Sequence, residues 1–166
     1  MKKIVILLIV ISVLGGCGIY TFSGTSIQPD VHSITVENFD NRAQLINPTL
    51  ANDITIALQD KYRKLTKLDM LSDGGDLVVS GFIASYEVSP TAITSEEVAS
   101  MNRLTISVRI KFVNEKHPED NFERTFAAYQ DYDSNNSLDS VQGILCEQII
   151  ETLVEDIFNA TVADWK

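Results

Sequence analysis

One ten-residue segment alternates apolar and polar side chains so strictly that it constrains the kind of sheet this chain can form. In the segment 103–112, every second residue is apolar and the residues between are polar or basic. The apolar set is Leu104, Ile106, Val108, Ile110 and Phe112, and the polar set is Arg103, Thr105, Ser107, Arg109 and Lys111. Because successive side chains of a strand point to opposite faces of a sheet, we predict a strand with one buried face and one solvated, partly basic face.

Hydrophobic periodicity predicts the other elements of the same domain. Strands are expected at 33–38, 77–88 and 122–129, and amphipathic helices at 48–66 and from Ser137 onward. The order β-α-β-β-β-α predicts an α+β fold, a two-layer sandwich in which one four-stranded, mainly antiparallel sheet carries two helices on one face. The segment 89–102, with its acidic pair Glu96 and Glu97, is expected to be a long connection.

Three local signals refine this outline. Asn47 and the Pro48 that follows it are expected to be the N-cap and the first position of the first helix. Either Ser134 or Ser137 is expected to cap the second helix. Gly81 interrupts an apolar run, and we interpret it as a bulge or as a site where another backbone packs closely.

The amino-terminal residues have the three parts of a signal peptide. Two lysines, Lys2 and Lys3, precede an apolar run at 4–14, which is too short to span a membrane as a helix of about 20 residues. The run ends in Leu14-Gly15-Gly16-Cys17. This motif resembles the lipobox of bacterial lipoproteins, in which the cysteine receives a diacylglyceryl group before cleavage and becomes the first mature residue.

We therefore divide the chain into a cleaved signal peptide (1–16), a lipidated tether (17–30) and a single α+β domain (31–166). Cys17 is the predicted site of lipid attachment, because several acyl chains on one residue hold a protein at a membrane in effect permanently. Gly18 stands where an Asp commonly signals retention of such proteins in the inner membrane. The predicted location is accordingly the outer membrane, with the domain facing the periplasm.

The charge of the mature chain excludes some partners. Without Lys2 and Lys3, 11 of the 13 basic residues remain against 23 acidic ones, which leaves a formal charge of −12. Nucleic acid is not an expected partner, since phosphate binding needs a basic surface that this composition lacks. The same charge disfavours an orientation in which the domain lies flat on anionic lipid.

The sequence offers no arrangement typical of an enzyme. It contains no Gly-x-Ser-x-Gly elbow, no phosphate-binding loop and no His-rich metal spacing. His32 and His117 are expected to be solvated surface residues, and Cys146 falls on the apolar side of the second helix, where a buried thiol is expected. We therefore predict a protein that is not an enzyme, with no cofactor, no metal and no catalytic residue.

The segment 131–139 raises one alternative on metal binding. It begins like a calcium-binding EF-hand loop, but Asn136 replaces the turn glycine and Gln142 replaces the bidentate Glu. The interpretation that we favour is that its carboxylates lie at the positive end of the second helix. Calcium binding by this loop stays open as the other interpretation.

The basic residues of the polar strand face allow two interpretations. Arg103, Arg109 and Lys111 are candidates to bind an anionic lipid or a protein partner, because they project from one face as a row. The interpretation that the sequence favours is that they are cross-strand partners of carboxylates such as Glu123. The sequence leaves both interpretations in place.

Five short segments of the mature chain, taken together, resemble one known family. They are Cys17–Gly24, with a lipidated Cys-Gly followed by an aromatic, an apolar residue and a Gly, then Phe39–Ala43, Asn47–Pro48, Asn102–Thr105 and Leu153–Asn159. The chain is thereby similar to the LptE-like lipoproteins that act in lipopolysaccharide (LPS) assembly, in their shorter form. The fold that this resemblance implies, a small sheet carrying two helices, agrees with the fold that periodicity predicts.

The resemblance also implies a function. It implies a non-enzymatic subunit of the outer-membrane LPS translocon, a large β-barrel whose lumen the lipoprotein partly fills while it assists barrel assembly and LPS delivery to the outer leaflet. LPS itself is a further ligand that the resemblance implies. The alternative is an uncharacterised structural or interaction lipoprotein that serves another cell-envelope complex.

The predicted anchor can be tested by replacing its thiol. We expect Cys17→Ala to leave a soluble or unprocessed protein, because Cys17 is the one attachment point for lipid that the sequence offers. Membrane fractionation and the mass of the mature amino terminus would measure this. Unchanged fractionation of the variant with the envelope would contradict the predicted anchor.

Overall fold

Three long antiparallel strands form the body of the sheet. The computed structural model describes residues 27–45, 47–91 and 100–163, so the predicted signal peptide, Cys17 and the pair Glu96–Glu97 lie outside the described residues. The strands are β4 (Leu77–Pro90), β5 (Met101–Asn114) and β6 (Phe122–Asp133). Every apolar residue of the predicted alternating set is buried, from Leu104 to Phe112. The predicted half-buried strand is confirmed and extends two residues further at each end.

Three short parallel strands widen this sheet at one edge. They are β1 (Ser33–Val36), β2 (Asp40–Asn41) and β3 (Asp69–Leu71), and the strand order is β3-β1-β4-β5-β6, with β2 also paired to β4. The sheet therefore has six strands and is mixed, which corrects the predicted four-stranded, mainly antiparallel sheet. Strands of two and three residues are too short to show the alternation on which the prediction rests.

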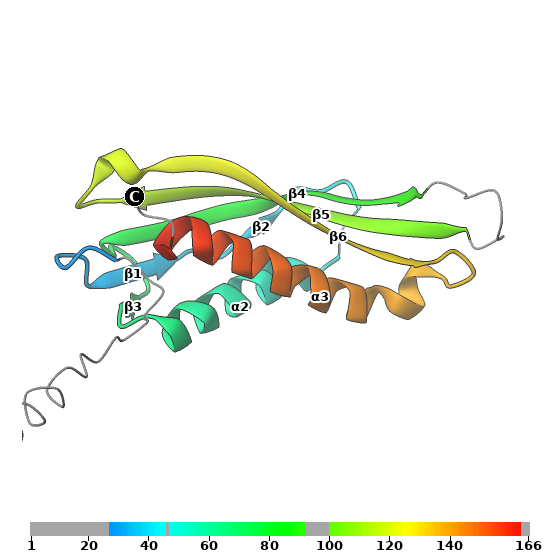
Figure 1. Ribbon diagram of the computed structural model, residues 1–166, viewed down its shortest axis with the longest axis horizontal. Coiled ribbons are helices and arrows are strands. Elements are labelled where there is room, and N and C mark those ends of the chain that lie inside the picture. Colours follow the sequence, from blue (N-terminus) through cyan, green and yellow to red (C-terminus); the bar gives the residue numbers. More distant parts are fainter. Residues whose placement is uncertain (1–26, 46, 92–99, 164–166) are drawn as a thin grey trace, which may run out of the picture.

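Two amphipathic helices cover one face of the sheet, as predicted (Figure 1). They are α2 (Leu50–Leu65) and α3 (Leu138–Phe158), and a short π-helical turn (Asn159–Ala163) follows α3. The buried stripe of α2 has the i, i+4 spacing Leu50, Ile54, Leu58 and Tyr62. The hydroxyl of Tyr62 lies 2.6 Å from that of Thr161, which ties the end of α2 to the turn after α3. Burial raises the pKa of Tyr62.

The helix starts differ in detail from the predicted caps. Helix α2 begins at Leu50 with Thr49 as N-cap, two residues later than predicted. Asn47 instead closes a turn before the helix, where its side-chain oxygen accepts hydrogen bonds from the amide and the hydroxyl of Thr49. Ser137 is the N-cap of α3, but its side chain makes no capping bond. Its carbonyl oxygen accepts hydrogen bonds from Ser140.

A five-residue loop crosses over β1 to join two strands that lie on opposite sides of it. The loop, 72–76, connects β3 to β4, and both of these strands pair with β1. Gly75 makes the crossing possible, because a Cβ atom at this position would lie 2.7 Å from the amide nitrogen of Thr35. The Gly75 amide donates to the Thr35 hydroxyl at 3.1 Å. At the loop's end, the Asp76 carboxylate accepts from the amides of His32 and Ser33, and the pKa of Asp76 is lowered accordingly.

Gly81 is a second site of close approach. A Cβ atom here would lie 2.4 Å from the carbonyl oxygen of Arg109 on the neighbouring strand, so the predicted close packing is confirmed. The predicted bulge is wrong at this position, since the irregularity of β4 falls between Ile83 and Ser85. The predicted long connection 89–102 is also shorter than expected, because β4 continues to Pro90 and β5 starts at Met101.

Substitutions at two glycines, Gly75 and Gly143, test the crossing over β1. We expect Gly75→Ala to lower the free energy of unfolding by about 1–3 kcal/mol, because the new methyl group meets backbone that cannot move aside. Gly143→Ala is the control, since nothing lies within 4 Å of a Cβ atom at this position of α3. It should stabilise the helix by up to about 1 kcal/mol. Urea denaturation measures both, and equal stabilities for the two variants would contradict the crossing.

Candidate functional site

The face of the sheet opposite the helices carries the predicted row of basic residues. From β5, Arg103, Arg109 and Lys111 project away from the core, while β6 supplies carboxylates on the same face. Arg109 donates from Nε to the Glu123 carboxylate at 2.9 Å and from Nη1 to the Thr125 hydroxyl at 3.3 Å. The cross-strand pairing that the sequence predicts for Glu123 is therefore present.

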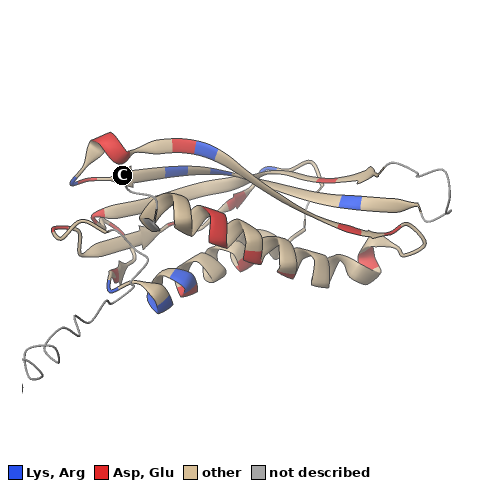
Figure 2. Ribbon diagram, in the orientation of Figure 1, with Lys and Arg blue, Asp and Glu red and all other residues tan. Residues whose placement is uncertain are grey.

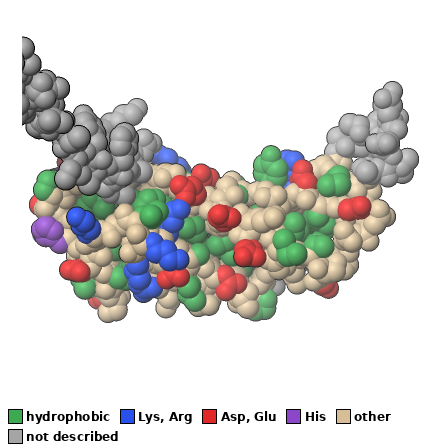
Figure 3. All heavy atoms as spheres, turned by 60° about the horizontal axis from the view of Figure 1, so that its bottom comes forward, with side chains coloured by type: hydrophobic (Ala, Val, Ile, Leu, Met, Phe, Trp, Pro, Cys, Tyr) green, Lys and Arg blue, Asp and Glu red, His purple; other side chains and the backbone are tan. Residues whose placement is uncertain are grey.

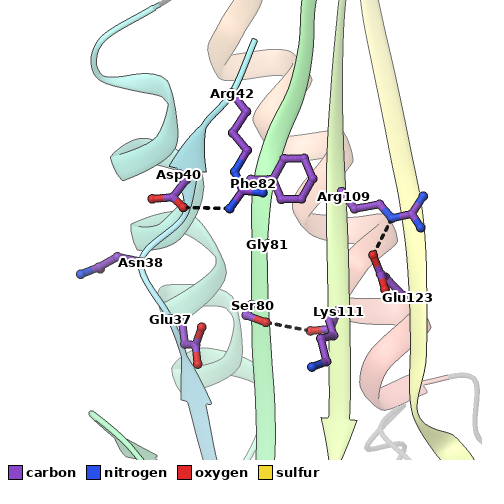
Figure 4. Close-up of a pocket in the computed structure, with 10 residues that line it drawn as sticks. All are labelled: Glu37, Asn38, Asp40, Arg42, Ser80, Gly81, Phe82, Arg109, Lys111 and Glu123. Atoms are coloured by element: carbon purple, nitrogen blue, oxygen red, sulfur yellow. Dashed lines mark hydrogen bonds and ion pairs between the residues drawn. The ribbon is translucent and has the colours of Figure 1, made fainter.

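A hollow of about 270 Å³ lies on this face, where the segment between β1 and β2 passes beside β4 (Figure 4). Phe82 lines it, and the guanidinium of Arg42 stacks on the Phe82 ring at 4.1 Å from the centroid. Gly81, next to Phe82, carries no side chain to fill the space. The lining residues come from β2, β4, β5, β6 and the β1–β2 link: Glu37, Asn38, Asp40, Arg42, Ser80, Gly81, Phe82, Arg109, Lys111 and Glu123.

The charges around the hollow are balanced in number. Three cations line it, Arg42, Arg109 and Lys111, and three carboxylates face them, from Glu37, Asp40 and Glu123. Arg42 is 3.3 Å from Asp40, and Arg109 is paired with Glu123. Among the described residues, Lys111 makes no ion pair, although Glu123 is its partner in the strand register. Lys111 is therefore the cation of the hollow that is most available to an external anion.

Arg103 belongs to a separate part of the same face. Its guanidinium forms a bidentate pair with the Asp131 carboxylate, at 2.7 and 2.9 Å, and lies 3.7 Å from the centroid of the Tyr129 ring. This pairing raises the pKa of Arg103 and lowers that of Asp131. Six residues of strand separate Arg103 from Arg109, which is roughly 20 Å. The predicted row thus divides into a paired arginine at one end and the hollow at the other.

The hollow includes Arg42 and Phe82, which the sequence did not indicate as site residues. Arg42 follows β2, a two-residue strand whose pairing with β4 has no signature in the alternation of polar and apolar residues. Phe82 lies in an apolar run of β4 that suggests burial on both faces. Its side chain points outward, away from the core. The Arg42–Phe82 contact depends on the parallel pairing of β2 with β4, which periodicity alone does not predict.

The cysteine and the two histidines singled out in the sequence lie outside this hollow. Cys146 is buried, as predicted, and its sulfur accepts a hydrogen bond from Asn47 at 3.7 Å. Burial raises the pKa of Cys146, which disfavours the reactive thiolate. His32 is exposed, as predicted. His117 is partly exposed, and its Nε2 lies 3.0 Å from the carboxylate of Asp30, a contact that raises the pKa of His117.

The carboxylates of the 131–139 loop are already engaged by protein groups. Asp131 binds Arg103, and Asp133 accepts hydrogen bonds from the amide and the side chain of Asn135. Within the described ranges, no three His, Cys, Asp or Glu side chains gather as metal ligands. The contacts of Asp131 and Asp133 therefore favour the interpretation in which the loop's carboxylates have structural partners.

The fold and this face define a class of protein, a two-layer α+β domain with a charged sheet face opposite its helices. Solved structures with a similar fold include a protein from Xanthomonas campestris (TM-score 0.54, 11% identity, covering 80% of this chain and 88% of that one). Another is a hypothetical protein from Chlamydia trachomatis (TM-score 0.52, 10% identity, covering 78% and 97%). Rare lipoprotein B from Shewanella oneidensis has a TM-score of 0.48 at 12% identity, covering 76% and 89%. At these identities, the first two show the fold alone.

The family follows from the sequence. The family model described as LptE, lipopolysaccharide-assembly, matches residues 31–161, so this chain belongs to the LptE family. No curated protein matches the chain in sequence. The resemblance stated above is confirmed, and the members of this family are non-enzymatic envelope lipoproteins associated with LPS assembly. No helix in the described part of the chain is long and apolar enough to cross a membrane.

The role of the hollow can be tested by reversing its two β5 cations. If this face binds a partner or a phosphorylated lipid, the double change Arg109→Glu and Lys111→Glu should weaken that association in a salt-sensitive way. Stability should fall by less than about 1 kcal/mol, because the Arg109–Glu123 pair is exposed. Partner recovery, LPS binding and thermal unfolding should be measured on the same protein.

A single change at the other end of the face provides the comparison. Arg103→Glu breaks the pair with Asp131 but leaves the hollow intact, so we expect it to leave association unchanged. Equal losses for the two variants would show that the whole row, rather than the hollow, makes the contact. Unchanged association in the double variant would remove this face from the list of candidate sites.

Proposed function

We propose that this protein is an outer-membrane lipoprotein, anchored through Cys17, that serves as a non-enzymatic subunit of the LPS translocon. In this role it assists assembly of the translocon's β-barrel and the delivery of LPS to the outer leaflet. The observation that carries the proposal is the match of residues 31–161 to the LptE family. The lipobox-like sequence before Cys17 supplies the anchor that such a role requires.

The elongated shape of the domain supports this role. The β4–β5 pair contains 14 residues in each strand, which corresponds to a body roughly 45 Å long. Two helices cover one side of this body and leave the opposite face exposed along its length (Figure 1). A long module with one uncovered charged face is suited to lie against the wall of a larger partner.

The charge distribution supports a proposal for the surface that meets that partner. The chain is acidic overall, with a formal net charge of −10, so a general attraction to LPS phosphates is not expected. The polar sheet face is the exception, because it places Arg42, Arg109 and Lys111 around one hollow. We place the contact with the barrel, and any direct contact with LPS, on this face.

Affinity purification of the full lipidated chain from mildly solubilised envelopes tests the proposal. We expect a large outer-membrane β-barrel protein to co-purify, and depletion of the lipoprotein to reduce LPS at the cell surface. A second outer-membrane lipoprotein with the same tag controls for barrels that are recovered through abundance alone. Recovery of the subunits of another envelope complex in place of the barrel would overturn the proposal and favour the alternative of an interaction lipoprotein serving that complex.

A further inference from the structure

The end of α2 carries the densest group of cations in the described chain. Four basic residues fall within the seven positions 61–67, and they are Lys61, Arg63, Lys64 and Lys67. In Figure 2 they mark the end of α2 and the turn that leads to β3. Figure 3 shows basic side chains grouped at this end of the helix layer, while acidic side chains spread along the rest of it.

Internal ion pairs account for two of these cations. Arg63 lies 3.1 Å from Asp60, and Lys61 is paired with Glu155 of α3, which lowers the pKa of Glu155. Lys64 and Lys67 are exposed and make no ion pair among the described residues. The helix dipole explains a cation in the last turn of α2, where Lys64 lies. It does not explain Lys67, which lies beyond the C-cap Thr66.

Exposed aliphatic side chains lie among these cations. Leu65, the last residue of α2, is 51% exposed, and Leu71, the last residue of β3, is 41% exposed. Between α2 and β3 lies a hollow of about 350 Å³, and its lining includes Arg63, Met70 and Leu71. Cations interleaved with exposed aliphatic groups are typical of surfaces that rest on lipid headgroups, where the charge meets phosphate and the apolar group enters the interface.

The chain enters the domain beside this surface. The amide of Asp69 donates to the carbonyl oxygen of His32 at 2.9 Å, and Ser33 is paired with Asp69 in the sheet. Asp69 is two residues after Lys67. The predicted lipid on Cys17 lies ten residues before Ile27, the first residue described. Ten residues of chain can reach at most about 36 Å. The anchor therefore keeps this end of the domain near the bilayer.

We propose that the end of α2, with Lys64, Lys67, Leu65 and Leu71, is a membrane-contact surface for anionic phospholipid headgroups of the leaflet that holds the lipid anchor. The proposal rests on the proposed function only through the anchor at Cys17. Contact at this end agrees with the acidic net charge, because exposed Glu147 of α3 lies beside the start of α2, at the end away from Lys64 and Lys67. The domain stands on the membrane at one end, with its sheet face free for a partner.

A fluorescent probe next to the surface tests this contact. Ser72 is exposed and lines the hollow beside Leu71, so a Ser72→Cys variant of the full lipidated chain can carry an environment-sensitive dye. The probe protein is reconstituted into phosphatidylcholine vesicles with and without phosphatidylglycerol. We expect the dye emission to shift to the blue when phosphatidylglycerol is present and to lose this shift at high salt, because screening weakens exposed charges.

Two charge-matched variants decide the origin of the shift. Lys64→Gln with Lys67→Gln should lower the ratio of membrane-contacting to free domain by about tenfold to thirtyfold, the effect of two cations at about 1 kcal/mol each. Arg103→Gln with Arg124→Gln removes the same charge from β5 and β6, on the side of the sheet away from β3 and outside the hollow, and should leave the emission unchanged. Thermal unfolding of both variants checks that each is folded.

The outcomes separate the surface from the anchor and from the translocon role. A protein that floats with vesicles but shows the same emission with and without phosphatidylglycerol overturns the surface and leaves the anchor in place. Equal losses in the two double variants also overturn it, since net charge would then explain the effect. A protein that does not float overturns the anchor and the surface together. Normal vesicle contact without recovery of the barrel supports the surface and counts against the translocon role alone.

Discussion

The burial of one face of β4, β5 and β6 beneath the helices is the contact on which the rest of the structure depends. Each fully buried aliphatic side chain contributes about 1.5–3 kcal/mol, and β5 alone buries Leu104, Ile106, Val108 and Ile110 completely. Strict alternation means that burial of these residues forces the residues between them to the opposite side. The hydrophobic core and the charged face are therefore two consequences of one pattern, and neither changes without the other.

The pairing of the short parallel strands with this body is not determined by burial of the sheet face alone. Strands β1 and β3 are joined by α2, and β4 returns on the other side of β1 through a loop that only a glycine at position 75 allows to pass so closely. Strands β1 and β2 pair with the same edge of β4 but are separated by the segment 37–39. This interruption brings Glu37 and Asn38 to the rim of the sheet-face hollow. The position of the hollow therefore depends on how β1 and β2 pair with the edge of β4.

The contrast between β5 and β2 shows what the sequence predicts and what it does not. Ten alternating residues in β5 predict the strand, its buried side and the outward direction of Arg103, Arg109 and Lys111. The pairing of Asp40 and Asn41 with β4 is a non-local contact between short segments, and no periodicity marks it. For that reason the sequence does not predict that Arg42 lines the hollow. The sequence also does not show that Arg103 is separate from Arg109 and Lys111. The spacing of residues predicts the face to which each side chain points, but not the carboxylate with which each cation pairs.

The uneven width of the sheet has a consequence for its stiffness. Near the start of β4, strands lie on both sides of it, and α2 covers β1, β2 and β3 there. Beyond Ser85, β4 pairs with β5 alone, and only β5 and β6 continue the sheet beside it. Amide hydrogens should therefore exchange slowly at the wide end and faster at the narrow end, since fewer buried contacts must open there. The domain is therefore expected to be stiffer where the chain enters it and to open more easily at the far tip. A partner that binds the tip would contact the part of the protein that changes conformation most readily.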